Sequence, residues 1–185
     1  NTSKLLETTQ NRLATGQRVQ SAVDAPVNYF TALGHRQRSS DLASRKDEMS
    51  ESVQLISAAN QGVESITSLI ASAKSLSQSA LSAASTSEIN TLYSQYEAVL
   101  EQIDLLAADS GYKGVNLLEN TAITHTVKFD ETGDSSLTMT GFDASAQGAT
   151  LSLSTHGTNE WVSAGGTADK AEINSAIAQL DNARS

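Results

Sequence analysis

The fold is decided by residues 24–84, which read DAPVNYFTALGHRQRSSDLASRKDEMSESVQLISAANQGVESITSLIASAKSLSQSALSAA. After Pro26, the helix-breaking residues in this stretch are Gly34 and Gly62. The apolar residues recur at steps of three, four and seven, which is the period of a helix with one buried seam. They are Leu42, Met49, Val53, Ile56, Val63, Ile66, Ile70, Ala73 and Ala80. We therefore predict one helix from Pro26 to Ala84, about 88 Å long at ~1.5 Å per residue.

Two later segments offer a cover for this apolar seam. Ser85 and Glu88 are spaced as a capping box, so a second helix is expected to begin there. Its apolar residues alternate steps of three and four: Ile89, Leu92, Tyr96, Val99, Ile103 and Leu106. Because the connection is short, this helix should fold back antiparallel on the first. A last helix, beginning at Thr167 or Asp169, brings Ile173, Ile177 and Leu180 to the same seam.

The residues between these helices have the texture of short strands. A turn is expected at 111–114, where two glycines flank Tyr112 and Lys113. Apolar and polar residues then alternate over 123–129, 136–140 and 149–154, with Thr and Val enriched and turn residues between the runs. The pattern predicts a small β-hairpin or three short strands, followed by a loop at 161–166.

The predicted fold class is mainly α: an elongated antiparallel helical bundle or coiled coil of long helices with a small β-hairpin region. Residues 1–25 hold the end of a helix, which Gly16 stops in the left-handed conformation, and an extended connection in which Asp24 caps the long helix. Residues 26–120 form the two-helix core, 121–166 the hairpin and loop region, and 167–185 the start of the last helix. Both ends of the chain are expected to be truncation points.

Composition excludes several classes of function. The 185 residues carry a formal charge of −9, which disfavours nucleic acid and anionic membrane surfaces as partners. Cysteine is absent, so disulfides and thiolate metal sites are excluded. The sequence has neither a run of 18 apolar residues nor a basic-then-apolar signal peptide. Aromatic residues make up only 4%, which suits thin helix–helix packing better than a thick globular core.

The sequence names no catalytic, cofactor-binding or metal-binding residue. His35, His125 and His156 are its only imidazoles, and none has a second ligand at metal-binding spacing. No HExxH, GxSxG or GxxxxGK[ST] pattern occurs. The carboxylates of the long helix are most simply explained as the solvent-exposed side of that helix, and they do not indicate a catalytic site. We therefore expect that the protein is not an enzyme.

Three segments carry a resemblance to a known family. Residues 11–19, NRLATGQRV, and 21–26, SAVDAP, resemble the N-terminal signature of bacterial flagellins. Residues 102–104, QID, with 111–118, GYKGVNLL, are similar to a second flagellin stretch of the same order and spacing. Residues 178–184, AQLDNAR, resemble the start of the C-terminal core helix of the family.

The resemblance implies a structural subunit of the bacterial flagellar filament, extracellular and self-assembling through long-helix contacts for motility. Its expected partners are other copies of itself, the flagellar cap and hook-associated proteins and the type III export apparatus. By this resemblance, residues 3–13 would be the remnant of an inner-layer helix. The implied candidates for subunit contacts are Arg12, Leu13, Gly16, Arg18, Ser21 and Asp24. An intrachain pair or plain solvation explains Arg18 and Asp24 equally well.

Two alternatives remain open at this point. One is the hook–filament junction protein, which shares the long helices and a related N-terminal block. The other is a non-flagellar secreted helical module that binds a partner helix through the seam from Ile89 to Leu106.

The family's middle layer is recognised by an innate immune receptor, through an Arg-containing RxREL stretch and a Glu of the second helix. The counterparts here are Ser72, Lys74 and Leu76, with Gln95 at the Glu position. The Arg and the Glu are missing, and Lys does not replace a bidentate Arg. The resemblance therefore predicts weak or no receptor activation.

Overall fold

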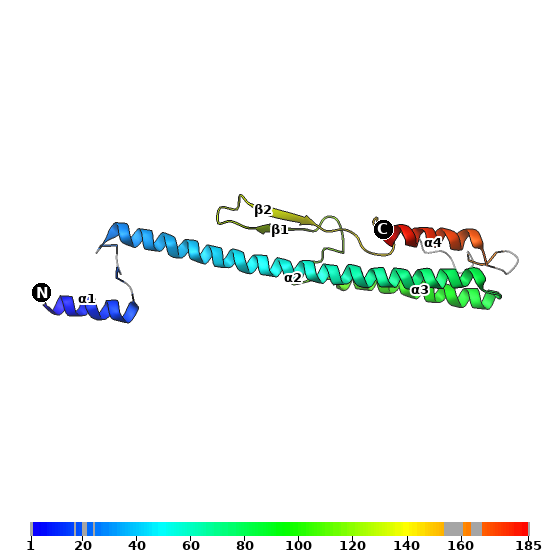
Figure 1. Cartoon of the computed structure of the whole chain (residues 1–185), viewed down its shortest axis with the longest axis horizontal. Helices are drawn as coiled ribbons and strands as arrows, with labels where there is room; N and C mark the ends of the chain where they lie inside the picture. Colours follow the sequence, from blue (N-terminus) through cyan, green and yellow to red (C-terminus); the bar gives the residue numbers. More distant parts are fainter. Residues whose placement is uncertain are drawn as a thin grey trace. The chain divides into compact units, whose positions relative to one another are not determined.

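The computed structural model describes residues 2–16, 18, 19, 22, 23, 25–153, 161–163 and 168–184. Within them the chain is mainly α-helical, as predicted. The helices are α1 (Thr2–Thr15), α2 (Pro26–Ser82), α3 (Thr86–Asp109) and α4 (Lys170–Arg184), and the strands are β1 (Thr124–Lys128) and β2 (Ser136–Thr140) (Figure 1). The chain forms two compact units, which we call unit 1 (residues 1–49 and 128–136) and unit 2 (residues 50–127 and 137–185).

Helix α2 is continuous over 57 residues, which confirms the long helix and ends it two residues before the predicted Ala84. Its first residue is Pro26, where the fixed φ suits a helix and the missing N–H costs no intrahelical bond. Gly62 is buried at a close approach, since a Cβ there would lie 2.3 Å from Ser110 Oγ. A Cβ added at Gly34 would meet no contact within 4 Å in the described part of the chain.

In unit 1, α1 ends as predicted. Gly16 follows it with φ +65°, a left-handed conformation that glycine adopts at low cost. Arg18 lies in a bend and Ala22 and Val23 in a turn, so the extended connection predicted for this segment is wrong at residues 22 and 23. The cap predicted from Asp24 lies outside the described residues.

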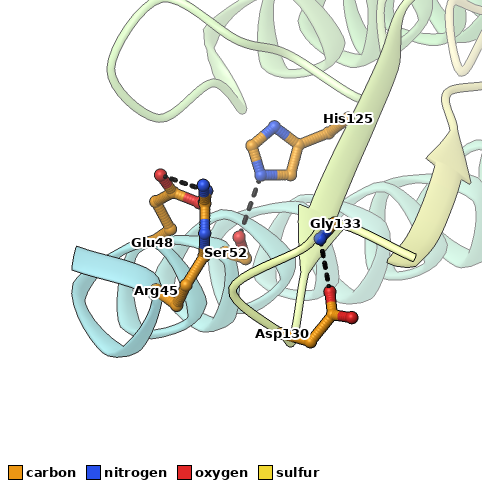
Figure 2. A network of polar contacts seen from close by, with 6 residues as sticks. All are labelled: Arg45, Glu48, Ser52, His125, Asp130 and Gly133. Atoms are coloured by element: carbon orange, nitrogen blue, oxygen red, sulfur yellow. Dashed lines mark hydrogen bonds and ion pairs between the residues drawn. The ribbon is translucent and has the colours of Figure 1, made fainter. Parts of the chain in front are cut away.

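The tip between β1 and β2, also in unit 1, is held by Asp130. Its Oδ1 accepts hydrogen bonds from the N–H of Gly133 at 2.8 Å and of Ser135 at 3.3 Å (Figure 2). The hydroxyl of Thr132 lies 2.7 Å from Asp130 Oδ2. These bonds, that of Thr132 first, lower the pKa of Asp130, because each favours the ionised carboxylate.

Unit 2 contains a three-helix core. Figure 1 shows α3 and α4 lying along the later part of α2, each running opposite to it. All three helices contribute buried residues: Ile66, Ile70, Ala73 and Ala80 from α2, Ile89, Tyr96 and Ile103 from α3, and Ile173 and Leu180 from α4. The predicted cover of α2 by the two later helices is confirmed over this part.

Four residues of the predicted buried seam are exposed, and for these residues the prediction is wrong. Leu42, Val53, Ile56 and Val63 are exposed by 44%, 61%, 41% and 37%. At three of these positions the buried face lies one residue earlier, because Ser52, Leu55 and Gly62 are buried beside Val53, Ile56 and Val63. The period of the sequence identified the helix but placed its buried face one residue too late at these three positions.

Of the two hydrogen bonds predicted for the capping box of α3, one is confirmed. Ser85 Oγ accepts the N–H of Glu88 at 3.3 Å, as a capping box requires. The carboxylate of Glu88, however, accepts the N–H of Ala84 at 3.2 Å rather than that of Ser85. Both contacts satisfy backbone N–H groups at the junction between α2 and α3. They therefore stabilise the turn at which the chain reverses direction.

The buried face of α3 is wider than the predicted seam. Tyr93 and Leu100 are 4% and 2% exposed, deeper than the predicted Leu92 and Val99 beside them. Trp161 explains the shift, because its fully buried ring packs against Tyr93 and Tyr96 at centroid distances of 5.3 and 4.9 Å. Trp161 lies in the predicted loop, but it serves as a core residue.

Strands β1 and β2 form a two-stranded antiparallel sheet, which confirms the hairpin. The third strand predicted at 149–154 is wrong for the described residues 149–153, which form a turn and irregular backbone. Their alternation has another cause: Leu151 and Leu153 are 8% and 1% exposed and insert into the core, with Ser152 between them at φ +49°.

Helix α4 begins at Lys170 with Asp169 as its cap. Asp169 Oδ1 accepts the N–H of Ala171 at 3.1 Å and of Glu172 at 3.4 Å. The predicted start of the last helix is therefore confirmed at Asp169, while Thr167 lies outside the described residues.

Candidate subunit-contact surface

The face of α1 is the first candidate surface, and its leucines are strongly exposed. Leu5, Leu6 and Leu13 are 70%, 59% and 79% exposed. Together with Thr2, Thr9 and Gln10 they line a shallow groove of about 290 Å³. Exposed leucines at helical spacing, with no cover in the described part of unit 1, are typical of a surface that meets another helix.

The predicted contact residues divide between this face and the connection after it. Arg12 and Leu13 lie exposed on the last turn of α1, and Gly16 ends the helix. Arg18 is exposed in the bend that follows. Ser21 and Asp24 lie outside the described residues, so a bridge between Arg18 and Asp24 stays a prediction.

A second candidate surface, which sequence reasoning missed, is the first part of α2 in unit 1. Val27 is 78% and Phe30 60% exposed, and the ring of Phe30 meets that of Tyr29 edge-on at 5.6 Å. The heptad pattern fails here because these residues fall outside the seam that begins at Leu42. The signal available in the sequence was the presence of large apolar residues, Val27 and Phe30, directly after Pro26.

An ion pair and a hydrogen bond near the middle of α2 hold side chains in place. Arg45 donates to both carboxylate oxygens of Glu48 at 2.9 and 2.6 Å, three residues along the same helix (Figure 2). In unit 2, Ser52 Oγ, in a residue only 4% exposed, lies 2.9 Å from His125 Nε2 on β1 (Figure 2). His125 therefore serves the attachment of the strand to α2.

The turn after α3 is locked by a residue that sequence reasoning also missed. Asn116 Nδ2 donates to the carbonyls of Ala107 and Ala108 at 2.7 and 2.9 Å, and its Oδ1 accepts the N–H of Leu118 at 2.9 Å. The side chain thus satisfies two of the carbonyls left open at the end of a helix. Asn116 belongs to the GYKGVNLL stretch, so a structural reason now exists for that motif.

The receptor-surface counterparts lie in unit 2, and part of the set is occupied. Lys74 forms an ion pair with Asp181 of α4, and Leu76 packs against the core. Ser72 is exposed on α2, with its hydroxyl bonded to the carbonyl of Ser68, and Gln95 is exposed on α3. Ser72 and Gln95 are therefore exposed, whereas Lys74 and Leu76 are half-buried.

No catalytic arrangement or metal site emerges in the described residues. Groups of three His, Asp or Glu side chains able to hold a metal are absent from them. Among the histidines, His35 is exposed, His125 bonds Ser52, and His156 lies outside the described residues. Nor does any helix of the described chain have the length and hydropathy to cross a membrane.

A groove of about 580 Å³ lies between α3 and the loop at Ala146 and Gln147, and Glu97, Glu101 and Asp104 are among the residues that line it. Asp104 accepts the N–H of Ala146 at 2.7 Å, so one of these carboxylates holds the loop that covers the core.

Comparison with known proteins agrees with this helical architecture. The family described as the bacterial flagellin N-terminal helical region matches residues 1–122, which include α1, α2, α3 and the turn built on Asn116. Flagellin FljK of Caulobacter vibrioides is 27% identical over 138 residues, which are 71% of this chain and 50% of that protein. The chain thus spans about half the length of this curated relative. Since the family match covers well over half of the sequence, the chain belongs to the bacterial flagellin family.

Proposed function

We propose that the protein is a structural subunit of the bacterial flagellar filament and assembles with other copies of itself. The family match over residues 1–122 carries the proposal. The exposed leucines of α1 and the exposed Val27 and Phe30 of α2 support it, because a polymer needs uncovered apolar surface in the free subunit.

The work of such a subunit is mechanical. The packed helices of unit 2 supply a rigid body, and the exposed helix faces of unit 1 supply the contacts. Each copy meets its neighbours through non-identical patches, and a contact of this kind that does not close builds a filament. We assign contact roles to Arg12, Leu13, Gly16, Arg18, Ser21 and Asp24 on this basis.

The same proposal covers partners and location. The subunit leaves the cell through the type III export apparatus, joins the filament beneath the cap, and follows the hook-associated proteins at the base of the filament. It acts outside the cell, within the flagellum, and it has no catalytic role.

The test is assembly of the full-length gene product seeded with filament fragments. Electron microscopy should show filaments of uniform diameter, and Leu13→Asp should slow their growth by adding a charge to the α1 face. Full-length protein that stays monomeric with seeds present would refute the proposed function. The 185-residue chain by itself should be monomeric or weakly associating in light scattering.

A further inference from the structure

Polar atoms without partners are concentrated where Trp161 packs on α3. Among the side chains that the structure describes, the buried nitrogen and oxygen atoms without a hydrogen-bond partner are Arg45 Nε, Asn90 Oδ1, Tyr96 Oη, Glu97 Oε1 and Trp161 Nε1. Three of these residues belong to α3, and Trp161 contacts that helix. Because buried polar groups in folded proteins are almost always hydrogen-bonded, this concentration requires a specific explanation.

The indole of Trp161 has the most restricted hydrogen bonding of these groups. Its ring is fully buried and packs against the rings of Tyr93 and Tyr96, at centroid distances of 5.3 and 4.9 Å. The Nε1–H group can only donate, so it requires an acceptor atom. None of the described residues supplies that acceptor. The core of unit 2 therefore contains a buried donor that is left for another molecule to satisfy.

Glu97 supplies a buried acceptor on the same part of α3. It follows Tyr96 directly and lies one turn after Tyr93, so all three residues belong to the part of the helix that Trp161 contacts. Its Oε1 atom is buried and has no partner among the described residues, and an ionised carboxylate can only accept hydrogen bonds. The charge of Glu97 also contributes, after burial, to the raised pKa of Tyr96, which agrees with a carboxylate close to the aromatic cluster.

The groove beside α3 gives this cluster room and access to solvent. Tyr93 and Glu97 are among the residues that line the groove, so two members of the cluster form part of its wall. Its volume of about 580 Å³ greatly exceeds the ~30 Å³ that one water molecule occupies in the liquid. A small polar molecule can therefore reach the cluster without unfolding unit 2.

We propose that Trp161 and Glu97 together bind one ordered water molecule. The water oxygen accepts the Nε1–H of Trp161, and one water O–H donates to Glu97 Oε1. Water suits the site because one small molecule offers both an acceptor and a donor. A cation such as ammonium cannot accept the indole N–H, and the carboxylate of Glu97 repels an anion. The bridge fastens the segment at Trp161 to α3, and it goes beyond the proposed function because it concerns a single chain.

Nuclear magnetic resonance of the 185-residue chain tests the bound water directly. The chain has one tryptophan, so its indole N–H gives one signal that needs no further assignment. Cross-relaxation from water to this proton is measured in the laboratory frame and in the rotating frame. A long-lived bound water gives cross-peaks of opposite sign in the two spectra, whereas chemical exchange of the indole proton gives the same sign in both. We expect cross-peaks of opposite sign.

Substitutions at Glu97 identify the second partner of the water. Glu97→Leu removes the acceptor and should abolish the cross-peaks, whereas Glu97→Gln keeps a carbonyl oxygen and should retain them. Glu101→Leu is the matched control, because Glu101 lines the same groove but is exposed, and it should change nothing. The double variant Tyr93→Phe with Tyr96→Phe removes the two phenol hydroxyls beside the indole. The cross-peaks should persist in it, because the proposed water bonds Trp161 and Glu97.

Several outcomes would overturn the proposal. Absence of the cross-peaks, or the same sign in both spectra, would mean that no long-lived water lies beside the indole. Loss of the cross-peaks in the double tyrosine variant would assign them to a phenol hydroxyl. Cross-peaks that survive Glu97→Leu, or that Glu101→Leu abolishes equally, would remove Glu97 as the partner. The proposed function has a separate readout, namely filaments of the full-length product, so either proposal can fail without the other.

Discussion

Gly62 of α2 faces Ser110 at the end of α3 so closely that a Cβ on Gly62 would lie 2.3 Å from Ser110 Oγ and 2.7 Å from Leu118 Cδ1. Real side chains do not approach to such distances, so any larger residue at position 62 must push α3 or the turn after it away. The close approach lets Ser110 and Leu118, which are 8% and 0% exposed, bury themselves against α2.

We predict that Gly62→Ala lowers the free energy of unfolding by about 1–3 kcal/mol, the usual cost of overpacking. The helix propensity of Ala works in the opposite direction by only ~1 kcal/mol. Gly34→Ala is the matched control, since its Cβ meets nothing within 4 Å in the described part of the chain, and it should stabilise α2. Urea unfolding monitored by circular dichroism measures both variants. Equal stabilisation by the two would contradict the close approach.

The turn locked by Asn116 gives the second prediction. Asn116→Leu keeps the approximate size of the side chain but removes three hydrogen bonds, at a residue that is 7% exposed. Each buried backbone group left without a partner costs about 1–3 kcal/mol, so we expect a loss of at least ~2 kcal/mol in unfolding free energy. Asn120→Ala, which removes an exposed bond to the N–H of Ala122, should change stability by less than about 0.5 kcal/mol. If Asn116→Leu lowers the free energy of unfolding by clearly less than this, water replaces the lost hydrogen bonds and the prediction is wrong.

These two positions show where sequence reasoning succeeds and where it stops. The long helix, the cap at Ser85 and the last helix depend on local period and local hydrogen bonds, which neighbouring residues encode. The roles of Gly62 and Asn116 depend on partners far along the chain, and no local pattern specifies them. A glycine inside a helix predicts a bend or a close interhelix approach, and the close approach is confirmed at Gly62, but the sequence does not identify Ser110 and Leu118 as its partners.

Burial differs from the predicted seam for the same reason. Ile66 and Val63 both fit the apolar period, but Ile66 is 4% exposed and Val63 is 37% exposed. The contrast arises because the buried face of α2 passes through Gly62, which lies against Ser110 and Leu118, and not through Val63. Trp161 lies in a Gly-rich stretch that reads as a loop, although its ring completes the core. The candidate contact residues came from the family resemblance, and of these Arg12 and Leu13 are exposed on α1.

The third prediction concerns Tyr96, because burial of its ring, and then the charge of Glu97, raise the pKa of Tyr96 from 10.0 to about 12. The neutral phenol is therefore favoured in the folded chain. Above pH 10 the unfolded chain loses this proton while the folded chain keeps it, so stability is lost as pH rises from 10 towards 12. From this group alone we expect the free energy of unfolding to fall by about 1 kcal/mol between pH 9 and 11, since one pKa unit corresponds to about 1.36 kcal/mol.

Tyr96→Phe should remove that alkaline loss. Tyr96 Oη has no hydrogen-bond partner among the described residues, so the substitution strands no other group. Tyr29→Phe in unit 1 serves as the control and should retain the loss. Urea unfolding at pH 8, 9 and 11 makes the comparison, and identical pH profiles for the Tyr96→Phe variant and the original chain would rule out this role.

The fourth prediction is weak or absent activation of the innate immune receptor that recognises the family's middle layer. Ser72 and Lys74 stand where the receptor-binding stretch of the family has Arg, and Gln95 stands where it has Glu. Lys74 also forms an ion pair with Asp181 of α4. A compact ammonium engaged in an ion pair does not supply the two parallel hydrogen bonds of a guanidinium. Pure monomer applied to a receptor reporter cell line should give little signal, with a strongly activating flagellin as positive control. Strong activation by this monomer would overturn the prediction.

The fifth prediction sets two opposing effects at Lys113 against each other. Lys113 and Gly114 occupy the turn between Tyr112 and Val115 with φ of 50° and 81°, and a left-handed backbone suits Asn better than Lys. The Lys113 ammonium pairs with Glu51 across an exposed surface, and this contact raises the pKa of Lys113. Lys113→Asn therefore removes backbone strain and an ion pair together. Because salt screens exposed pairs, the variant should gain stability relative to the original chain as ionic strength rises.

The background variant Glu51→Gln separates the two effects, since it lacks the ion pair from the start. In that background Lys113→Asn should raise the urea midpoint at low and at high salt alike. In the original chain, the ion pair also predicts its own pH dependence. A raised Lys pKa stabilises the fold below the unfolded pKa of 10.5, and this contribution is lost as pH rises through the folded value. A salt-independent effect of Lys113→Asn in the original chain would show that the pair with Glu51 contributes nothing, and that the left-handed turn alone decides the outcome.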